Sequence, residues 1–278
     1  MQRTIDKKIN AQATSDGDGV KISRSIGSRA LSEVDPFLLL DELRSDDAAD
    51  YIGGFPSHPH RGFETVTYML EGQMRHKDSA GNEGVIRAGD IQWMTAGSGI
   101  VHSEMPEQTE GRLWGFQFWI NLPAAQKMRA PRYQEIAAEN IPEVALEGGK
   151  VRVLAGEVNT PDGVVQVAAS DIATQPLLLD VQLDSGEWIG QIPTDHEALL
   201  YVYRGELNVG GASVQQQQLA RLSAGDSLHL VAEKSFGALV LAAAHINEPI
   251  ARSGPFVMNT QEELQQAFSD FRSGNFAQ

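Results

Sequence analysis

Residues 89–104, Gly-Asp-Ile-Gln-Trp-Met-Thr-Ala-Gly-Ser-Gly-Ile-Val-His-Ser-Glu, form the stretch that decides the fold. A Gly-Asp turn opens it, and Gly97 and Gly99 provide a second turn where a small barrel needs one. The runs that follow the turns are rich in Ile, Val and aromatic side chains, which is the pattern of short strands. Side chains two residues apart in a strand point to the same face, so His102 and Glu104 would face one side together.

A second pair with this spacing precedes the stretch. His58 and His60 flank a proline, and in an extended strand their backbones would lie about 6.5 to 7 Å apart on one face. Two strands lining one barrel would then offer four ligands to a shared centre. These candidate metal ligands are His58, His60, His102 and Glu104. A lone His-x-His pair is more often a surface or turn feature, and the surrounding glycine turns are what favour a metal site here.

The ligand types narrow the choice of metal. Three neutral imidazoles and one carboxylate suit Fe(II), and also Mn, Co, Ni, Cu or Zn. The chain has no cysteine, which excludes thiolate ligands, iron–sulfur clusters, disulfides and cysteine nucleophiles. We therefore expect one divalent transition metal per chain, with Fe(II) as the first candidate.

The composition argues against binding to nucleic acid and against association with membranes. The 278 residues carry a formal net charge of -15, which argues against direct binding to nucleic acid or to anionic membrane surfaces. The first ten residues are charged and lack an apolar core, and the longest apolar stretch, residues 236–246, is too short to span a bilayer. We expect a cytoplasmic protein.

An internal sequence similarity predicts two similar structural units. Tyr-Met-Leu-Glu-Gly at 68–72 and Ala-Gly-Asp at 88–90 resemble Tyr-Val-Tyr-Arg-Gly at 201–205 and Ala-Gly-Asp at 224–226. Each unit shows the strand, glycine turn and hairpin from which two-sheet jelly-roll barrels are built.

The boundary between the units is expected near Glu139, because residues 130–149 are polar, contain prolines and would serve as a linker. The predicted domains are residues 1–138, which would bind the metal, and residues 139–278, which would include a tail helix.

Helical periodicity is clearest in that tail. Asn259 or Thr260 could cap a helix from about Gln261 to Arg272. Its apolar face would consist of Leu264, Ala267, Phe268 and Phe271. A shorter helical stretch is expected at residues 124–128, after a proline.

The second unit is expected to hold no metal. When the shared glycines of the two units are aligned, other residue types stand opposite all four candidate ligands. The residues opposite are, in ligand order, Gln191, Pro193, Ala238 and Val240. The remaining histidines have no partner at same-face spacing and are expected to be structural or on the surface; they are His76, His196, His229 and His245.

Residues 58–64 and 89–104 resemble the two cupin motifs in the form that they take in the pirin family. The resemblance extends to the tail, where residues 247–249 and 254–260 are similar to the C-terminal segment of pirins. It implies an all-β fold of two tandem cupin (jelly-roll) β-barrel domains with a short C-terminal helix.

The resemblance also bears on the carboxylate ligand. The general cupin pattern would take it from Glu64, whereas the pirin form takes it from Glu104. We assign Glu104 as the ligand and as the candidate catalytic base, and we expect Glu64 to stand behind the metal on the strand face that also carries His58 and His60.

Pirins with this motif resemble quercetinases, in which a flavonol binds the metal through its 3-hydroxyl, loses a proton, reacts with dioxygen and releases carbon monoxide. The implied activity is a metal-dependent quercetin 2,3-dioxygenase, with a flavonol-like substrate and dioxygen as partners. Two alternatives stay open: a non-catalytic, metal-binding regulator that acts through protein partners, and a different cupin reaction at the same ligands.

Overall fold

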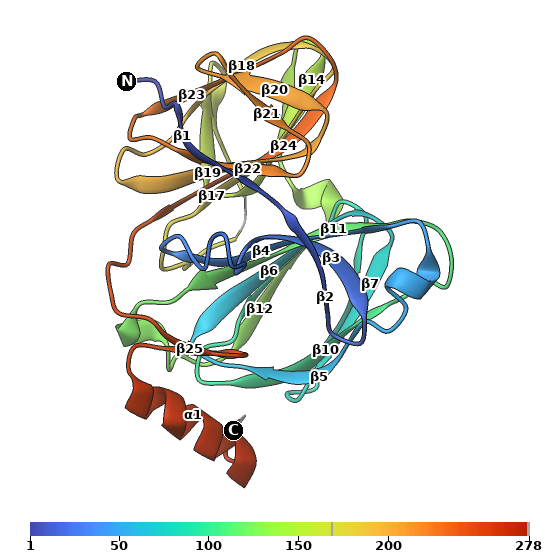
Figure 1. Ribbon diagram of the computed structural model, residues 1–278, viewed down its shortest axis with the longest axis vertical. Helices are drawn as coiled ribbons and strands as arrows, with labels where there is room; N and C mark the ends of the chain where they lie inside the picture. Colours follow the sequence, from blue (N-terminus) through green and yellow to red (C-terminus); the bar gives the residue numbers. More distant parts are fainter. Residues whose placement is uncertain (168, 277–278) are drawn as a thin grey trace. The chain divides into compact units, whose positions relative to one another are not determined.

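The computed structural model describes residues 1–167 and 169–276. Most of its regular structure is β-strand, with one α-helix near the C-terminus of the described chain (Figure 1). Internal contacts divide the chain into two units, each built from separate segments. The N-half unit comprises Ala13–Ser28, Ser32–Ala138 and Ile246–Gln278, and the C-half unit comprises Met1–Gln12, Arg29–Leu31 and Glu139–His245.

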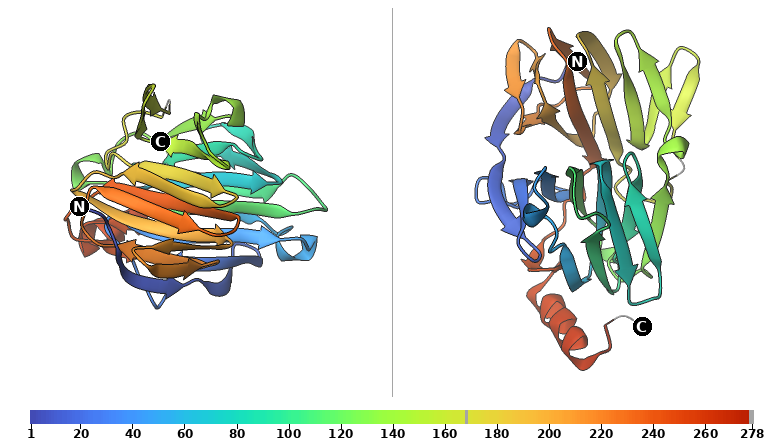
Figure 2. Two further views of the ribbon diagram at one scale, coloured as in Figure 1. Left: turned by 90° about the horizontal axis from the view of Figure 1, so that it is seen from above. Right: turned by 90° about the vertical axis from the view of Figure 1, so that its right-hand side faces the viewer.

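Two antiparallel sheets form the N-half unit (Figure 2). The larger contains, in spatial order, β12 (Arg132–Ile136), β9 (Ile91–Thr95), β6 (Phe63–Glu71), β11 (Leu113–Asn121), β4 (Phe37–Ser45), β3 (Val20–Ile26) and β2 (Gln12–Asp16). The smaller contains β5 (Phe55–His60), β10 (Ile100–Pro106), β7 (Gln73–Asp78) and β8 (Glu83–Arg87). Side chains of both sheets meet in a shared core, such as Leu43 and Met69 from the larger and Met74 and Ile86 from the smaller.

The C-half unit repeats this strand order. Its larger sheet contains β1 (Ile5–Asn10), β22 (Gln218–Leu222), β19 (His196–Arg204), β24 (Phe236–Ala244), β17 (Leu177–Leu183), β14 (Gly149–Ala155) and β13 (Glu143–Leu146). Its smaller sheet contains β18 (Gly186–Gln191), β23 (Ser227–Ala232), β20 (Glu206–Val209) and β21 (Ala212–Gln215). A small hairpin of β15 (Glu157–Thr160) and β16 (Gly163–Gln166) is added. The predicted all-β fold of two similar jelly-roll units with a C-terminal helix is confirmed.

The N-terminal strand completes the sheet of the C-half unit. β1 pairs with β22 there, just as β12 pairs with β9 in the N-half unit. The buried Arg3 fixes this start of the chain, because its Nη2 donates to the carbonyl oxygens of Pro193 and His196 at 2.8 and 3.1 Å. The contact units therefore differ from the predicted continuous ranges 1–138 and 139–278 at both chain ends, and that division stays a prediction.

Two expectations about the layout of the sheets need correction. Neither unit closes into a barrel among the described residues, because each larger and smaller sheet ends in its own edge strands and the two sheets meet through side chains. The Gly-Asp turn at 89–90 lies between β8 and β9, whereas the turn at 225–226 lies between β22 and β23, one connection later. A Gly-Asp turn suits any tight connection, so this part of the sequence similarity does not mark corresponding positions in the two units.

The expected linker, residues 130–149, is ordered structure. β12 and the 3₁₀ helix Ala138–Asn140 lie within it, and β13 pairs with the start of β14. Its polar composition reflects edge strands, which keep one side in water. The short helical stretch after Pro123 is a single 3₁₀ turn, Ala124–Gln126.

The tail is attached to the N-half unit. The helix α1 (Gln261–Ser273) begins at Thr260 with a capping box, as its sequence predicts. It follows the hairpin of β25 (Ala251–Ser253) and β26 (Phe256–Met258), and it buries Leu264 and Ala267. Among the described residues, no helix has the length and apolar character needed to cross a membrane.

Phe256 is the centre of this attachment. Its side chain is 1% exposed, and its ring lies 4.8 Å from that of Phe268 and 5.2 Å from that of Phe276. The Arg61 guanidinium adds an ion pair, with Nη1 2.7 Å from Oδ2 of Asp270 in the helix. The docked tail thus rests on a small aromatic core and one partly buried charge pair.

We expect Phe256→Ala to lower the free energy of unfolding by about 3 to 5 kcal/mol, because it empties this core. The matched control is Phe271→Ala, since Phe271 is 40% exposed and should cost much less. Urea denaturation of both variants measures the difference. Equal costs, or rapid proteolytic loss of the tail from the native protein, would contradict the docking.

Candidate metal centre

The antiparallel register of β5 and β10 brings the predicted histidines together. His102 stands opposite His58, and Ile100 opposite His60. One ring nitrogen of each of the three histidines lies within 4.8 Å of those of the other two. His60 and His102 are 3% and 2% exposed, so the cluster is closed to bulk water on that side.

The ring nitrogens of these histidines fit a metal ion. Nδ1 of His58 lies 2.8 Å from the carbonyl oxygen of Pro56, and donation there leaves the Nε2 lone pair as the ligand. Nε2 of His58 is 2.9 Å from Nε2 of His60, close to the roughly 3 Å that separates two neighbouring ligands at ordinary metal–nitrogen distances. Both ring nitrogens of His102 are buried without a hydrogen-bond partner, a cost that a bound cation would remove.

Burial keeps two of the imidazoles, those of His60 and His102, neutral. It lowers the pKa of His102 to about 4, although the Glu104 carboxylate opposes this shift. Burial also lowers the pKa of His60 well below its ordinary value, and the neighbouring His102 and His58 add to the effect. Metal ligation requires the neutral ring, so the protein holds these side chains in the protonation state that a metal needs.

Glu104 follows His102 by two residues on β10, but its carboxylate is not in the group of ligand atoms that meet within 4.8 Å, so its place as a ligand stays a prediction. It is 2% exposed and sits beyond an irregularity in the β5–β10 register. Thr67 Oγ1 donates to its Oε1 at 3.2 Å, and Gln117 Nε2 donates to its Oε2 at 2.8 Å. Sequence reasoning missed Thr67 and Gln117, although a polar side chain at an inward position of a largely apolar strand is a signal for both.

The expectation for Glu64 is wrong. The chain turns between β5 and β6, so Glu64 lies on a different sheet from His58 and His60. On β6, Phe63 contacts the His60 ring and Thr67 reaches Glu104, and alternation puts Glu64 on the opposite face. There its Oε1 accepts a hydrogen bond of 2.7 Å from Thr95, and burial raises its pKa.

A pocket of about 640 Å³ opens onto the cluster. Aromatic side chains line it beside the histidines, with the Trp119 ring 5.2 Å from that of His60 and Phe55 in the same wall. Charged groups form another part of the wall. Nε and Nη2 of Arg24 donate to the two carboxylate oxygens of Asp41 at 2.8 and 2.7 Å. The pocket therefore offers flat apolar surface, fixed charges and a cluster of nitrogen ligands together.

Comparison with known proteins identifies the family. The family model described as "Pirin" matches residues 19–120, and the one described as "Pirin C-terminal cupin domain" matches residues 178–277. The chain belongs to the pirin family.

Individual pirins and a solved structure agree with this assignment. A pirin-like protein of Caulobacter vibrioides is 48% identical, over 99% of this chain and 99% of its own. A Vibrio cholerae protein named "Putative quercetin 2,3-dioxygenase" is 47% identical, over 99% of this chain and 98% of its own. A crystal structure of quercetin 2,3-dioxygenase from Acinetobacter baumannii has a TM-score of 0.90 and 35% identity, over 99% of both chains.

The strand order corrects the comparison of the two halves of this pirin. β10 corresponds to β23, whereas Ala238 and Val240 lie on β24, the counterpart of β11. On β23 the buried side chains are Leu228 and Leu230, and Leu230 stands opposite Trp188 of β18. Apolar residues thus stand opposite His102 and Glu104, as expected, but they are Leu228 and Leu230 of β23 and not Ala238 and Val240. The single-metal expectation itself stays a prediction.

Each of the remaining histidines, His245 included, has a ring nitrogen within 4 Å of a carboxylate oxygen. His76 is buried and lies 2.5 Å from Glu135, and His229 lies 2.7 Å from Glu187. His196 is bound to a carbonyl oxygen and to Asp195.

A buried lysine fixes the turn that follows His60. Nζ of Lys127, which is 1% exposed, donates to the carbonyl oxygens of Gly62 and Val257 at 2.8 and 3.0 Å and to Asn121 Oδ1 at 2.6 Å. Burial lowers its pKa to about 8. Gly62 has no room for a side chain, since a Cβ there would lie 2.0 Å from the Val257 oxygen. Lys127 therefore ties the end of β5 to the tail hairpin.

We expect Lys127→Met to destabilise the protein by several kcal/mol, because each buried acceptor left unpaired costs about 1 to 3 kcal/mol. Metal affinity should also fall, since the turn after His60 loosens. Lys150→Met, which removes an exposed lysine, is the control. Urea denaturation and metal titration measure both effects. A Lys127→Met protein as stable as the control would refute this role.

Proposed function

We propose that this pirin is a metal-dependent dioxygenase that cleaves flavonols, in the manner of quercetin 2,3-dioxygenase. The observation that carries the proposal is the group of three histidines, of which His60 and His102 are buried and neutral, near the buried Glu104 carboxylate. Two of them, His58 and His60, line a pocket with aromatic walls. The names of the Vibrio and Acinetobacter relatives support the same reaction.

One divalent transition metal would be held by His58, His60, His102 and Glu104, with Fe(II) as the first candidate because nitrogen and carboxylate ligands suit it. When bound, the metal would supply Lewis-acid polarisation of the substrate hydroxyl and redox chemistry toward dioxygen. The protein keeps the imidazoles of His60 and His102 neutral and keeps water from the buried side of the site.

The pocket walls suit a flat polyphenol. Phe55 and Trp119 offer apolar ring surface, and the Arg252 guanidinium lies 5.0 Å from the Trp119 ring centre. The Arg24 and Asp41 pair provides fixed donors and acceptors for phenolic hydroxyls. A volume of about 640 Å³ is in the range of small-molecule sites.

Glu104 is the proposed base. Its carboxylate is oriented by Thr67 and Gln117 and lies next to the histidines, so it is placed to take the proton of the 3-hydroxyl. The other buried glutamate, Glu64, bonds to Thr95 on the opposite face of β6 and is not placed to act as the base. Gln117 also lines the pocket, so it links the position of Glu104 to that of the substrate.

Glu104→Gln with metal bound should cleave quercetin about 10²-fold more slowly, because an amide cannot accept the proton. Glu64→Gln makes the same chemical change on the opposite face of β6 and should keep the rate within a few-fold. Oxygen uptake with quercetin measures both. A metal-replete Glu104→Gln protein with the unmodified rate would exclude Glu104 as the base.

His102→Ala should lower metal occupancy about 10-fold or more while the protein stays folded, because the unit keeps its apolar cores. His229→Ala, which removes a histidine on β23, should bind metal as before. Metal analysis of protein purified without chelator gives the occupancy. Unfolding on metal removal would show instead that the ion is structural.

If the protein consumes no oxygen with quercetin when loaded in turn with iron, manganese, nickel and copper, the dioxygenase proposal fails. A metal-binding regulator that acts through protein partners would then take its place.

A further inference from the structure

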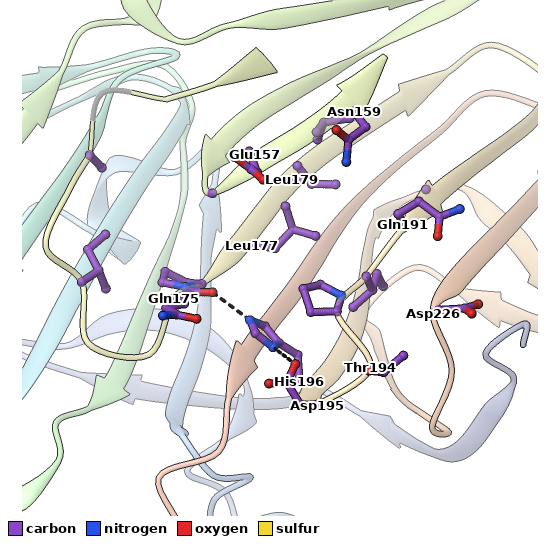
Figure 3. A pocket seen from close by; sticks show the side chains of 18 of the residues that line it. Glu157, Asn159, Gln175, Leu177, Leu179, Gln191, Thr194, Asp195, His196 and Asp226 are labelled. Carbon is purple, nitrogen blue, oxygen red and sulfur yellow. Dashed lines mark hydrogen bonds and ion pairs between the residues drawn. The ribbon is translucent and has the colours of Figure 1, made fainter. Parts of the chain in front are cut away.

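The C-half unit contains a cavity of about 940 Å³ whose lining comes from that unit alone (Figure 3). Its walls include β17 and β18, the counterparts of β4 and β5, which line the histidine pocket in the N-half unit. The cavity therefore occupies the equivalent place in the repeated fold. The metal site and flavonol pocket do not use it.

Apolar side chains form the floor of this cavity. Leu177 and Leu179 come from β17 and Trp188 from β18, and all three are buried against the main core of the unit. Figure 3 shows the two leucine side chains in the middle of the cavity, between Gln175 and Asn159. An apolar floor of this kind favours a ligand with a hydrocarbon or aromatic body.

The charges around the cavity have one sign. The lining contains no lysine and no arginine. It contains four carboxylates, those of Glu157, Asp171, Asp195 and Asp226. Asp195 contacts His196, and Asp226 contacts the N-terminal amine. The chain as a whole is also acidic, at -15. This lining attracts cations and repels anions.

The Trp188 indole adds a donor. The side chain is 6% exposed, lines the cavity and lies close over Gly190, where a Cβ would come within 2.1 Å of the ring. Within residues 1–167 and 169–276, its N–H has no hydrogen-bond acceptor. The indole nitrogen is not among the fully buried atoms that lack a partner, so its N–H stays accessible and can donate to a ligand oxygen at this wall.

One side of the cavity is held in place by His196. Its Nε2 lies 2.9 Å from the carbonyl oxygen of Gln175, and its Nδ1 lies 3.1 Å from Asp195 Oδ1 (Figure 3). These contacts join residues 169–176 to the start of β19. With both ring nitrogens engaged, His196 acts as a wall and is not a ligand for a metal.

We propose that this cavity binds a small organic amine that also carries a hydroxyl or carbonyl oxygen. The ammonium group lies toward Glu157, the apolar body rests on Leu177 and Leu179, and the oxygen accepts from the Trp188 indole. This site is independent of the proposed dioxygenase activity.

Three probes with the same phenyl and hydroxyl groups test the proposal by calorimetric titration of the full chain: 2-amino-1-phenylethanol, 1-phenylethane-1,2-diol and mandelate. The amine should bind with a Kd at least about 10-fold below that of mandelate, with the neutral diol between them. No saturable binding of the amine, or equal binding of mandelate, would overturn the proposal.

Variants locate the binding. Glu157→Gln should weaken amine binding about 10-fold and leave quercetin cleavage unchanged, since Glu157 is exposed and lies in the other unit from the histidines. Glu147→Gln removes the same charge at an exposed turn outside the cavity and should bind the amine as before. Unchanged binding in Glu157→Gln, or an equal loss in both variants, would refute this location.

Discussion

The structure depends on holding three imidazoles at one point, two of which, those of His60 and His102, are buried with ring nitrogens that have no hydrogen-bond partner among the described residues. A buried polar group that lacks a partner is destabilising, so the surroundings must hold the rings in place. The register of β5 and β10 sets His58 beside His102. Lys127 then fixes the turn after His60 and binds the tail hairpin through the Val257 oxygen. The tail helix is thus part of the support of the site, because Arg61, the next residue after His60, pairs with Asp270.

The two units show how one strand order serves two interiors. In the N-half unit, the inward positions of β5 and β10 are polar and require partners such as Thr67 and Gln117 on the facing sheet. In the C-half unit, the corresponding strands contribute Trp188 and Leu230 to a continuous apolar core. Apolar packing needs no matched hydrogen bonds, so the second unit can adopt the same strand order without polar side chains at these positions.

Sequence reasoning succeeded where short-range spacing carries the information. The i, i+2 pair of His58 and His60 and the Thr260 capping box are local, and each appears as expected. It failed where the outcome depends on long-range pairing. The face of Glu64 changes because Gly62, with a φ of 88°, ends one strand before the next begins. The role of the first residues as an edge strand depends on a partner, β22, that lies about two hundred positions away in the chain.

There is a physical reason why the two units differ at β5 and β18. β5 and β18 are edge strands of the smaller sheets, so each has a hydrogen-bonded neighbour on one side only. An edge strand can change its side chains, and the loops that flank it, with less disturbance to the sheet than a central strand. The pockets of both units open at these edges. A fold of this kind can therefore keep a metal site at one edge and develop an organic binding site at the other, while the central strands β6 and β19 retain the same packing role.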